Sequence, residues 1–215
     1  YSASPEKLQL HASQTRPASY LVTATDFQKE QQVLRRGIYL TNYVCEKICK
    51  MTIRFNEMRE AISVMRETAA WGRGKGYRVW PDQWLTPEEL ITADALPENF
   101  CIGSVDGQTA CAFILQWTDA EYWPDAPRYE AAYLHKFCVC RSFAGMGMTR
   151  LAVEAVKAEC RKRGISYIRL DTALDEKKVR KIYLKAGFRI VDIIDYPNGS
   201  SMALYELEVQ RAAQG

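Results

Sequence analysis

The chain has 215 residues, of which 47% are hydrophobic, enough to bury the core of one ordinary domain with extra segments or of two small domains. Its net charge of +3 arises in the first fifty residues, which hold seven Lys/Arg and four Asp/Glu, whereas residues 51–215 hold 22 of each. A formally neutral body lacks the basic stripe of a nucleic-acid-binding domain, no apolar run reaches the ~20 residues of a membrane span, and the first residues do not resemble a secretory leader, so neither nucleic acid nor a membrane is an expected partner.

The seven cysteines are an odd number and lie mostly within apolar stretches, which favours reduced thiols and a cytoplasmic protein. Two pairs, Cys45 with Cys49 and Cys138 with Cys140, lack the two-residue spacing of a zinc knuckle. We therefore expect small buried hydrophobic side chains at these positions, and no metal.

The N-terminal part differs from the rest in composition. Residues 1–25 are rich in Ser, Thr, Ala and Gln without periodicity, which is typical of a disordered segment. Residues 26–50 are compatible with a helix. The chain is thus divided into an extension, 1–50, that is partly disordered, a domain, 51–210, and a tail, 211–215. Met51 as the natural start of the protein is an alternative.

The first predicted elements of the domain are a strand, 51–55, and a helix that starts at the N-cap Asn56 and runs to about residue 70. Three glycines within 71–76 are expected to break this helix. The Gly-Arg-Gly-Lys-Gly run does not follow a strand and lacks the spacing of a phosphate loop, so a nucleotide site is not expected. Thr86 followed by Pro and two Glu predicts a short helix.

The later segments alternate strand and helix. Asp106-Gly107 is typical of a hairpin turn, and Gly164 and Gly187 are expected to end helices. These signals predict strands at 100–105, 109–117, 132–140, 167–170, 188–192 and 202–207, and helices at 148–163 and 175–186. The expected fold class is mixed α/β, with antiparallel strands first and strand-helix-strand units later.

A glycine-containing loop, 141–147, joins the strand 132–140 to the helix that follows. Glycines at this place let backbone amides turn toward a ligand, and the helix N-terminus adds about half a positive charge. The loop therefore predicts a phosphate site, and a tight turn without a ligand is the alternative. Two glycines instead of three, after an antiparallel hairpin, disfavour a dinucleotide-binding fold.

A second motif, Tyr-Leu-Lys-Ala-Gly-Phe at 183–188, ends a helix about forty residues after the glycine loop. Together the two motifs resemble the GNAT superfamily of N-acetyltransferases over residues 51–209, most specifically over 134–191. The resemblance implies a mixed, mostly antiparallel twisted sheet flanked by helices. It also implies that the sheet splays between its fourth and fifth strands, with acetyl-CoA in the opening.

The resemblance implies roles for individual residues. Tyr183 would protonate the leaving thiolate, the loop amides would bind the pyrophosphate of coenzyme A, and the fourth strand would pair with the pantetheine. Ser142 departs from the usual Arg or Gln, with Arg141 next to it, and Glu176 stands where many relatives have Asn. The cofactor-binding candidates are Phe137, Cys138, Val139, Ser142, Phe143, Ala144, Gly145, Met146, Gly147, Met148 and Glu176.

A general base is needed because a lysine-like amine, with a pKa of about 10.4, must lose a proton. Glu130, at the entrance to the fourth strand, is the first candidate. Asp119 and Glu121 are weaker ones, and each of the three has a solvated loop acid as its alternative. His135 is a further candidate base, although packing alone also accounts for a histidine in a strand.

The acceptor is expected near residues 117–125, where acids alternate with aromatic side chains, with Trp71, Trp80 and Trp84 on the other side of the cleft. Acids and aromatics both attract a small cationic amine. The predicted function is acetyl transfer from acetyl-CoA to the primary amine of a small molecule. A catalytically silent module that binds acyl-CoA is the alternative, and a homodimer is left open.

Overall fold

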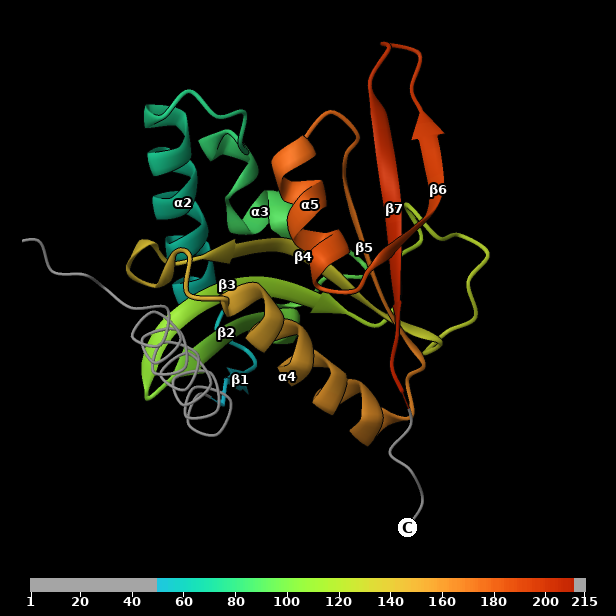
Figure 1. Ribbon diagram of the computed structural model, residues 1–215, viewed down its shortest axis with the longest axis horizontal. Helices are drawn as coiled ribbons and strands as arrows, with labels where there is room; N and C mark the ends of the chain where they lie inside the picture. The colour runs from blue at the N-terminus through green and yellow to red at the C-terminus, as the bar shows by residue number, and fades with distance from the viewer. Residues whose placement is uncertain (1–49, 211–215) are drawn as a thin grey trace, which may run out of the picture. The chain divides into compact units, whose positions relative to one another are not determined.

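The computed structural model describes residues 50–210, all of which belong to the compact unit Ile48–Gly215. The expectations for residues 1–49 and for the tail, 211–215, therefore lie outside the described residues. Seven strands form one sheet with the order β1-β2-β3-β4-β5-β7-β6 (Figure 1). The strands are β1 Thr52–Arg54, β2 Phe100–Val105, β3 Gln108–Gln116, β4 Ala131–Val139, β5 Tyr167–Ala173, β6 Arg189–Asp195 and β7 Ser201–Glu208.

The sheet is antiparallel except where β4 and β5 run side by side. These two strands pair over only three residues each, and Tyr133 opposite Arg169 is the last pair. Both strands continue beyond this pair, so their unpaired ends part. The expected mixed sheet, with a splay between its fourth and fifth strands, is confirmed.

Helices cover both faces of the sheet (Figure 1). Side chains of α2 and α3 pack with Phe100 and Ile114 in one buried cluster, whereas those of α4 and α5 pack with Phe113 and Leu170 in another. The alternation of side chains along a strand accounts for this division, because neighbouring residues such as Phe113 and Ile114 point to opposite faces. The helices are α2 Met58–Gly74, α3 Pro87–Leu90, α4 Met148–Arg163 and α5 Lys177–Lys185.

Helix α2 differs from the prediction at both ends. Asn56 has φ 61° and is not the N-cap, a place that Glu57 takes. The helix continues through two glycines to Gly74, because Gly72 packs against Val79: a Cβ at Gly72 would lie 3.0 Å from a Val79 methyl carbon. The absent side chain thus allows a close contact instead of breaking the helix. Helix α4 has the predicted bounds, and Gly164 ends it with φ 70°.

Strand β4 contains a bulge beside the splay. Ala112 pairs with Cys138 and Ile114 with His135, so three residues of β3 face four of β4. Lys136 takes up the extra length with φ 52°, a left-handed conformation that is uncommon for residues other than Gly. The bulge places His135 and Lys136 together at one cavity, described below.

The described cysteines are mostly buried thiols, in line with the expectation. Cys101, Cys111, Cys138 and Cys160 are at most 6% exposed. Burial raises the pKa of Cys111, Cys138 and Cys160 to about 12, so these thiols stay protonated at neutral pH. Within residues 50–210, no group of three or more His, Cys, Asp or Glu is placed to hold a metal ion, and no helix is long and apolar enough to span a membrane.

Candidate active site

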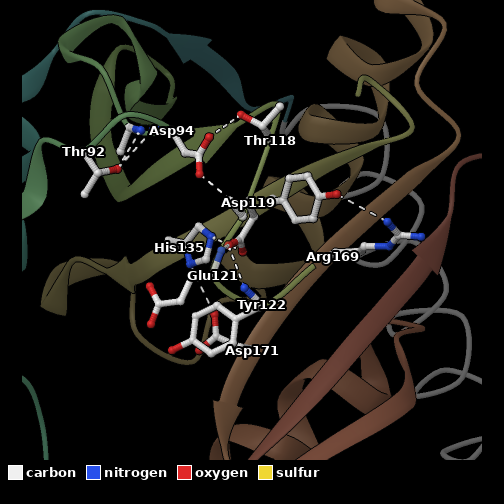
Figure 2. Close-up of polar contacts among 12 residues, drawn as sticks. Thr92, Asp94, Thr118, Asp119, Glu121, Tyr122, His135, Arg169 and Asp171 are labelled. Carbon is white, nitrogen blue, oxygen red and sulfur yellow. Dashed lines mark hydrogen bonds and ion pairs between the residues drawn. The ribbon is translucent and has the colours of Figure 1, made fainter. Parts of the chain in front are cut away.

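The central feature of the site is a histidine between two carboxylates. Nε2 of His135 lies 3.1 Å from Oδ2 of Asp119, and Nδ1 lies 3.2 Å from Oδ1 of Asp171 (Figure 2). The Asp119 side chain is 4% exposed, and that of His135 is 17% exposed. The Nε2–Oδ2 contact is poorly aligned, so within the described part of the chain neither atom makes a hydrogen bond.

The loop after β3 holds Asp119 in place. Oδ1 of Asp119 accepts hydrogen bonds from the amides of Glu121 and Tyr122, which leaves Oδ2 directed at the histidine. The ring of Tyr122 stacks near His135, with 6.4 Å between the ring centroids. Asp94 fastens the same loop to the segment after α3, because its carboxylate accepts hydrogen bonds from the Thr118 hydroxyl and the Ala120 amide.

A cavity of about 390 Å³ opens beside this cluster. Five carboxylates line it against one lysine and one histidine, so its wall attracts cations. Burial lowers the pKa of Lys136, while a hydrogen bond from Thr118 lowers the pKa of Asp94. The ionisable lining groups are Glu89, Asp94, Asp119, Glu121, Tyr122, His135, Lys136 and Asp171.

The two carboxylates determine the charge of His135. Burial alone would lower its pKa, but the contacts with Asp119 and Asp171 raise the pKa to about 9. The free protein therefore carries an imidazolium here at neutral pH, and the neutral ring becomes the major form only above about pH 9.

Tyr183 lies on α5 and belongs to the buried cluster that α4 and α5 cover. Its ring packs against Phe188 and Tyr205, and no other described residue makes a hydrogen bond with its hydroxyl. Burial raises the pKa of Tyr183 above its usual value, with Asp171 adding to the effect. The hydroxyl therefore stays protonated well above neutral pH. In this form it can act as a proton donor but not as a general base.

The glycine loop has the geometry of an anion cradle. Gly145 and Gly147 have φ of 80° and 77°, and a Cβ added at either would meet nothing within 4 Å. The amides of Gly145, Gly147 and Met148 donate no hydrogen bond to a described residue; Gly147 is the N-cap of α4, and Met148 is its first residue. Free amides, open space and a helix N-terminus fit the pyrophosphate of coenzyme A.

Two arginines lie at the rim of this region. The Arg141 guanidinium carbon is 3.5 Å from the centroid of the Trp71 ring, and Ser142 beside it is exposed. Arg78 joins the segment after α2 to the turn before α5 through ion pairs with Asp175, at 2.7 Å, and Glu176, at 3.9 Å.

The three tryptophans expected at the cleft separate in the structure. Trp71 is placed at Arg141, and Trp80 lies 5.4 Å from Nζ of Lys136, next to the cavity. Trp84 is 55% exposed and does not line the cavity.

The structure does not bring Glu130 to the cavity. Its carboxylate pairs with Arg169 at 2.9 Å, just before the segment in which β4 and β5 are joined. His135 lies five residues further along, about 16 Å at the usual rise of a strand. Asp119 and Glu121 do line the cavity, as does Asp171, which comes directly after the strand predicted at 167–170 and for which the sequence predicted no role.

Comparisons with known proteins agree with this architecture. The model of the acetyltransferase (GNAT) family matches residues 63–188. The uncharacterized N-acetyltransferase YesJ of Bacillus subtilis is 23% identical over 192 residues, which cover 86% of this chain and 98% of that protein.

Two solved structures have a similar fold. A GNAT-family acetyltransferase from Listeria monocytogenes superposes with a TM-score of 0.57 at 22% identity, covering 74% of this chain and 94% of that one. A putative GNAT acetyltransferase from Desulfovibrio desulfuricans gives 0.55 at 19%, covering 74% and 99%. The match to the family model spans both the cavity wall and the glycine loop, and the chain belongs to the GNAT family of acetyltransferases, as an acetyl-CoA-dependent N-acetyltransferase.

Proposed function

We propose that this enzyme acetylates the primary amine of a small cationic molecule that binds in the cavity beside His135. The lining of this cavity carries the proposal: five carboxylates surround about 390 Å³, a volume suited to a small molecule. Each nearby carboxylate attracts an ammonium group, and this Coulomb attraction is stronger where water is partly excluded.

The glycine loop and the cavity supply the two halves of the reaction. The free amides of the loop would hold the pyrophosphate of acetyl-CoA, and the opening between β4 and β5 would carry the pantetheine to the splay. Tyr183 would give its proton to the sulfur that leaves, because its hydroxyl is protonated and lacks another described partner. Positioning the amine against the thioester accounts for much of the expected rate.

Three acceptors of equal length test the proposed class: 1,4-diaminobutane, 4-amino-1-butanol and 4-aminobutanoate. They share a four-carbon chain with a terminal primary amine and differ in the group at the other end, so the kcat/KM per primary amine should fall in that order as the charge of that group goes from positive to neutral to negative. Release of the coenzyme A thiol is the readout. If the aminobutanoate is acetylated best, the carboxylate wall does not select the acceptor.

A variant pair links the preference to the cavity. Glu121→Gln removes one lining charge, and Asp125→Asn removes an exposed charge of the same loop that does not line the cavity. The first should raise KM for the diamine about two- to fivefold, as for a partly exposed charge pair, and the second should not. If acetyl-CoA binds tightly but no tested amine causes release of the coenzyme A thiol, a catalytically silent binding module would instead be favoured.

A further inference from the structure

His135 and Asp171 occupy the point where the sheet opens. The parallel register pairs Ala131 with Tyr167 and Tyr133 with Arg169. Continued by two residues, it sets His135 beside Asp171 at the start of the parting strands. The observed Nδ1–Oδ1 distance of 3.2 Å agrees with that placement. The imidazole therefore lies where an acceptor from the cavity would meet a thioester held in the opening.

The opposite side of the imidazole offers two acceptors without a donor. In the neutral ring with its proton on Nδ1, which lies 3.2 Å from Oδ1 of Asp171, the lone pair of Nε2 lies 3.1 Å from Oδ2 of Asp119. Both atoms are buried, and apart from their mutual contact, drawn dashed in Figure 2, neither has a partner among the described residues. In the imidazolium the proton on Nε2 faces Oδ2, but once His135 is neutral the two buried acceptors have no donor between them, although buried polar atoms are nearly always satisfied. The N–H of an amine, or a water that it contacts, would satisfy both.

Resting on the proposed function, we propose that His135 is the proton acceptor of the reaction and that Asp119 and Asp171 are its positioning residues. The amine nitrogen attacks the carbonyl carbon of the thioester, so that an N–C bond forms and the C–S bond breaks. The ammonium proton is lost to solvent before the attack, and as the N–C bond forms one further proton passes from the nitrogen to Nε2 of His135, directly or through one water. Tyr183 gives one proton to the sulfur, and solvent then returns the imidazole proton to the phenolate.

Several charged groups face His135 and govern its titration. Asp119 and Asp171 contact the imidazole, and Tyr122 stacks on it. Lys136 is the next residue in the chain, and Glu121 lines the same cavity. Helix α3 and the segment after it contribute further acids. The acids outnumber the one lysine, so the group should titrate on the alkaline side of neutrality. The groups on the remaining elements are Glu89, Asp94 and Tyr183.

The pH dependence of kcat/KM tests the role. In the wild-type enzyme, kcat/KM should rise with pH up to about 9, as His135 loses its proton. Asp171→Asn should move this rise toward neutral pH, because one of the two carboxylates that favour the imidazolium is gone. His135→Gln should abolish the part of the rise that does not depend on the acceptor's pKa and lower turnover by about 10²- to 10⁴-fold, whereas Asp125→Asn should leave the profile unchanged.

Acceptor amines of different pKa separate the two titrations that contribute to the profile. The part of the pH profile that reflects deprotonation of the amine shifts with the pKa of the acceptor. The part, or limb, that reflects deprotonation of His135 stays at the same pH. A packed histidine without a catalytic part predicts that Asp171→Asn lowers stability but leaves the limb in place. That result, or a His135→Gln enzyme that retains the limb, would overturn the assignment.

An independent readout uses the small number of histidines. The chain has two, so a His11→Gln variant leaves the imidazole of His135 as the only one observed by NMR. Its titration should have a midpoint near pH 9 and shift down in Asp171→Asn. If no amine is acetylated, the proposed function fails and the catalytic role fails with it, even with this titration as expected. If amines are acetylated but the midpoint lies near 6.5, only the inference about His135 and its carboxylates is refuted.

Discussion

Replacing Tyr183 by Phe removes one oxygen atom and keeps the ring. The ring centroid lies 5.9 Å from that of Phe188 and 6.0 Å from that of Tyr205, and both contacts persist in the variant. The hydroxyl makes no hydrogen bond with a described residue, so its loss should change the free energy of unfolding by less than about 1 kcal/mol. Truncation to Ala would by contrast cost about 3–5 kcal/mol.

The catalytic effect of Tyr183→Phe should be much larger than its effect on stability. A positioned acid contributes about 10²- to 10⁴-fold, equivalent to ~3–5 kcal/mol of the barrier, so turnover with the best amine should fall within that range. Binding of acetyl-CoA, measured by calorimetry, should be nearly unchanged, because the proton is needed only as the C–S bond breaks.

Tyr205→Phe is the matched control for this experiment. Tyr205 is fully buried in the same cluster, and its hydroxyl accepts a hydrogen bond from Nε of Arg180. It should lose about 1 kcal/mol of stability and keep its turnover. A Tyr183→Phe enzyme that retains more than about a third of wild-type turnover would leave the tyrosine as a packing residue.

Three further predictions concern the loop, the buried charges and pH. Gly145→Val should weaken acetyl-CoA binding, measured by calorimetry, about tenfold or more, because a β-branched residue does not adopt φ of 80°. The thermal stability of the variant should fall much less than its affinity does. Arg169→Met should cost about 1–3 kcal/mol in urea unfolding, since Glu130 loses its ion pair and the buried Glu206 keeps only Arg189, whereas Arg189→Met, 71% exposed, should cost less than about 1. The pKa of His135, raised from 6.5 to about 9, stabilises the fold fully below about pH 6.5 and progressively less up to pH 9. The wild type should therefore lose up to about 3 kcal/mol between pH 6.5 and 10 that His135→Gln does not lose, and equal losses would refute the raised pKa.

Local signals made much of the fold predictable from the sequence. Glycines with positive φ end α4 and shape the loop before it, so both bounds of this helix could be read from Gly147 and Gly164. The hairpin at Asp106-Gly107 follows from turn chemistry in the same way. Gly72 misled the prediction for α2 because its role depends on Val79, a tertiary contact that no local pattern contains.

The composition of the site was less accessible to the sequence. Asp119, His135 and Asp171 come from a loop and two strands, and they meet only through the register of β4 and β5 and the bulge at Lys136. A parallel register cannot be read from alternation alone, since any shift by two residues preserves the alternation. Glu130 was a reasonable candidate by its place near the strand, but Arg169, its partner in the fold, lies far from it in the sequence.

The buried thiols give the folded enzyme a chemical property of its own. Cys101, Cys111, Cys138 and Cys160 are buried and stay protonated, whereas only a thiolate attacks a disulfide reagent. A colorimetric reagent that counts the coenzyme A thiol should therefore leave these four untouched during turnover. Unfolding exposes these four thiols and returns their pKa values to the ordinary range. In an assay without acetyl-CoA, the same reagent should therefore detect four additional reactive thiols per molecule when the clusters on both faces of the sheet open.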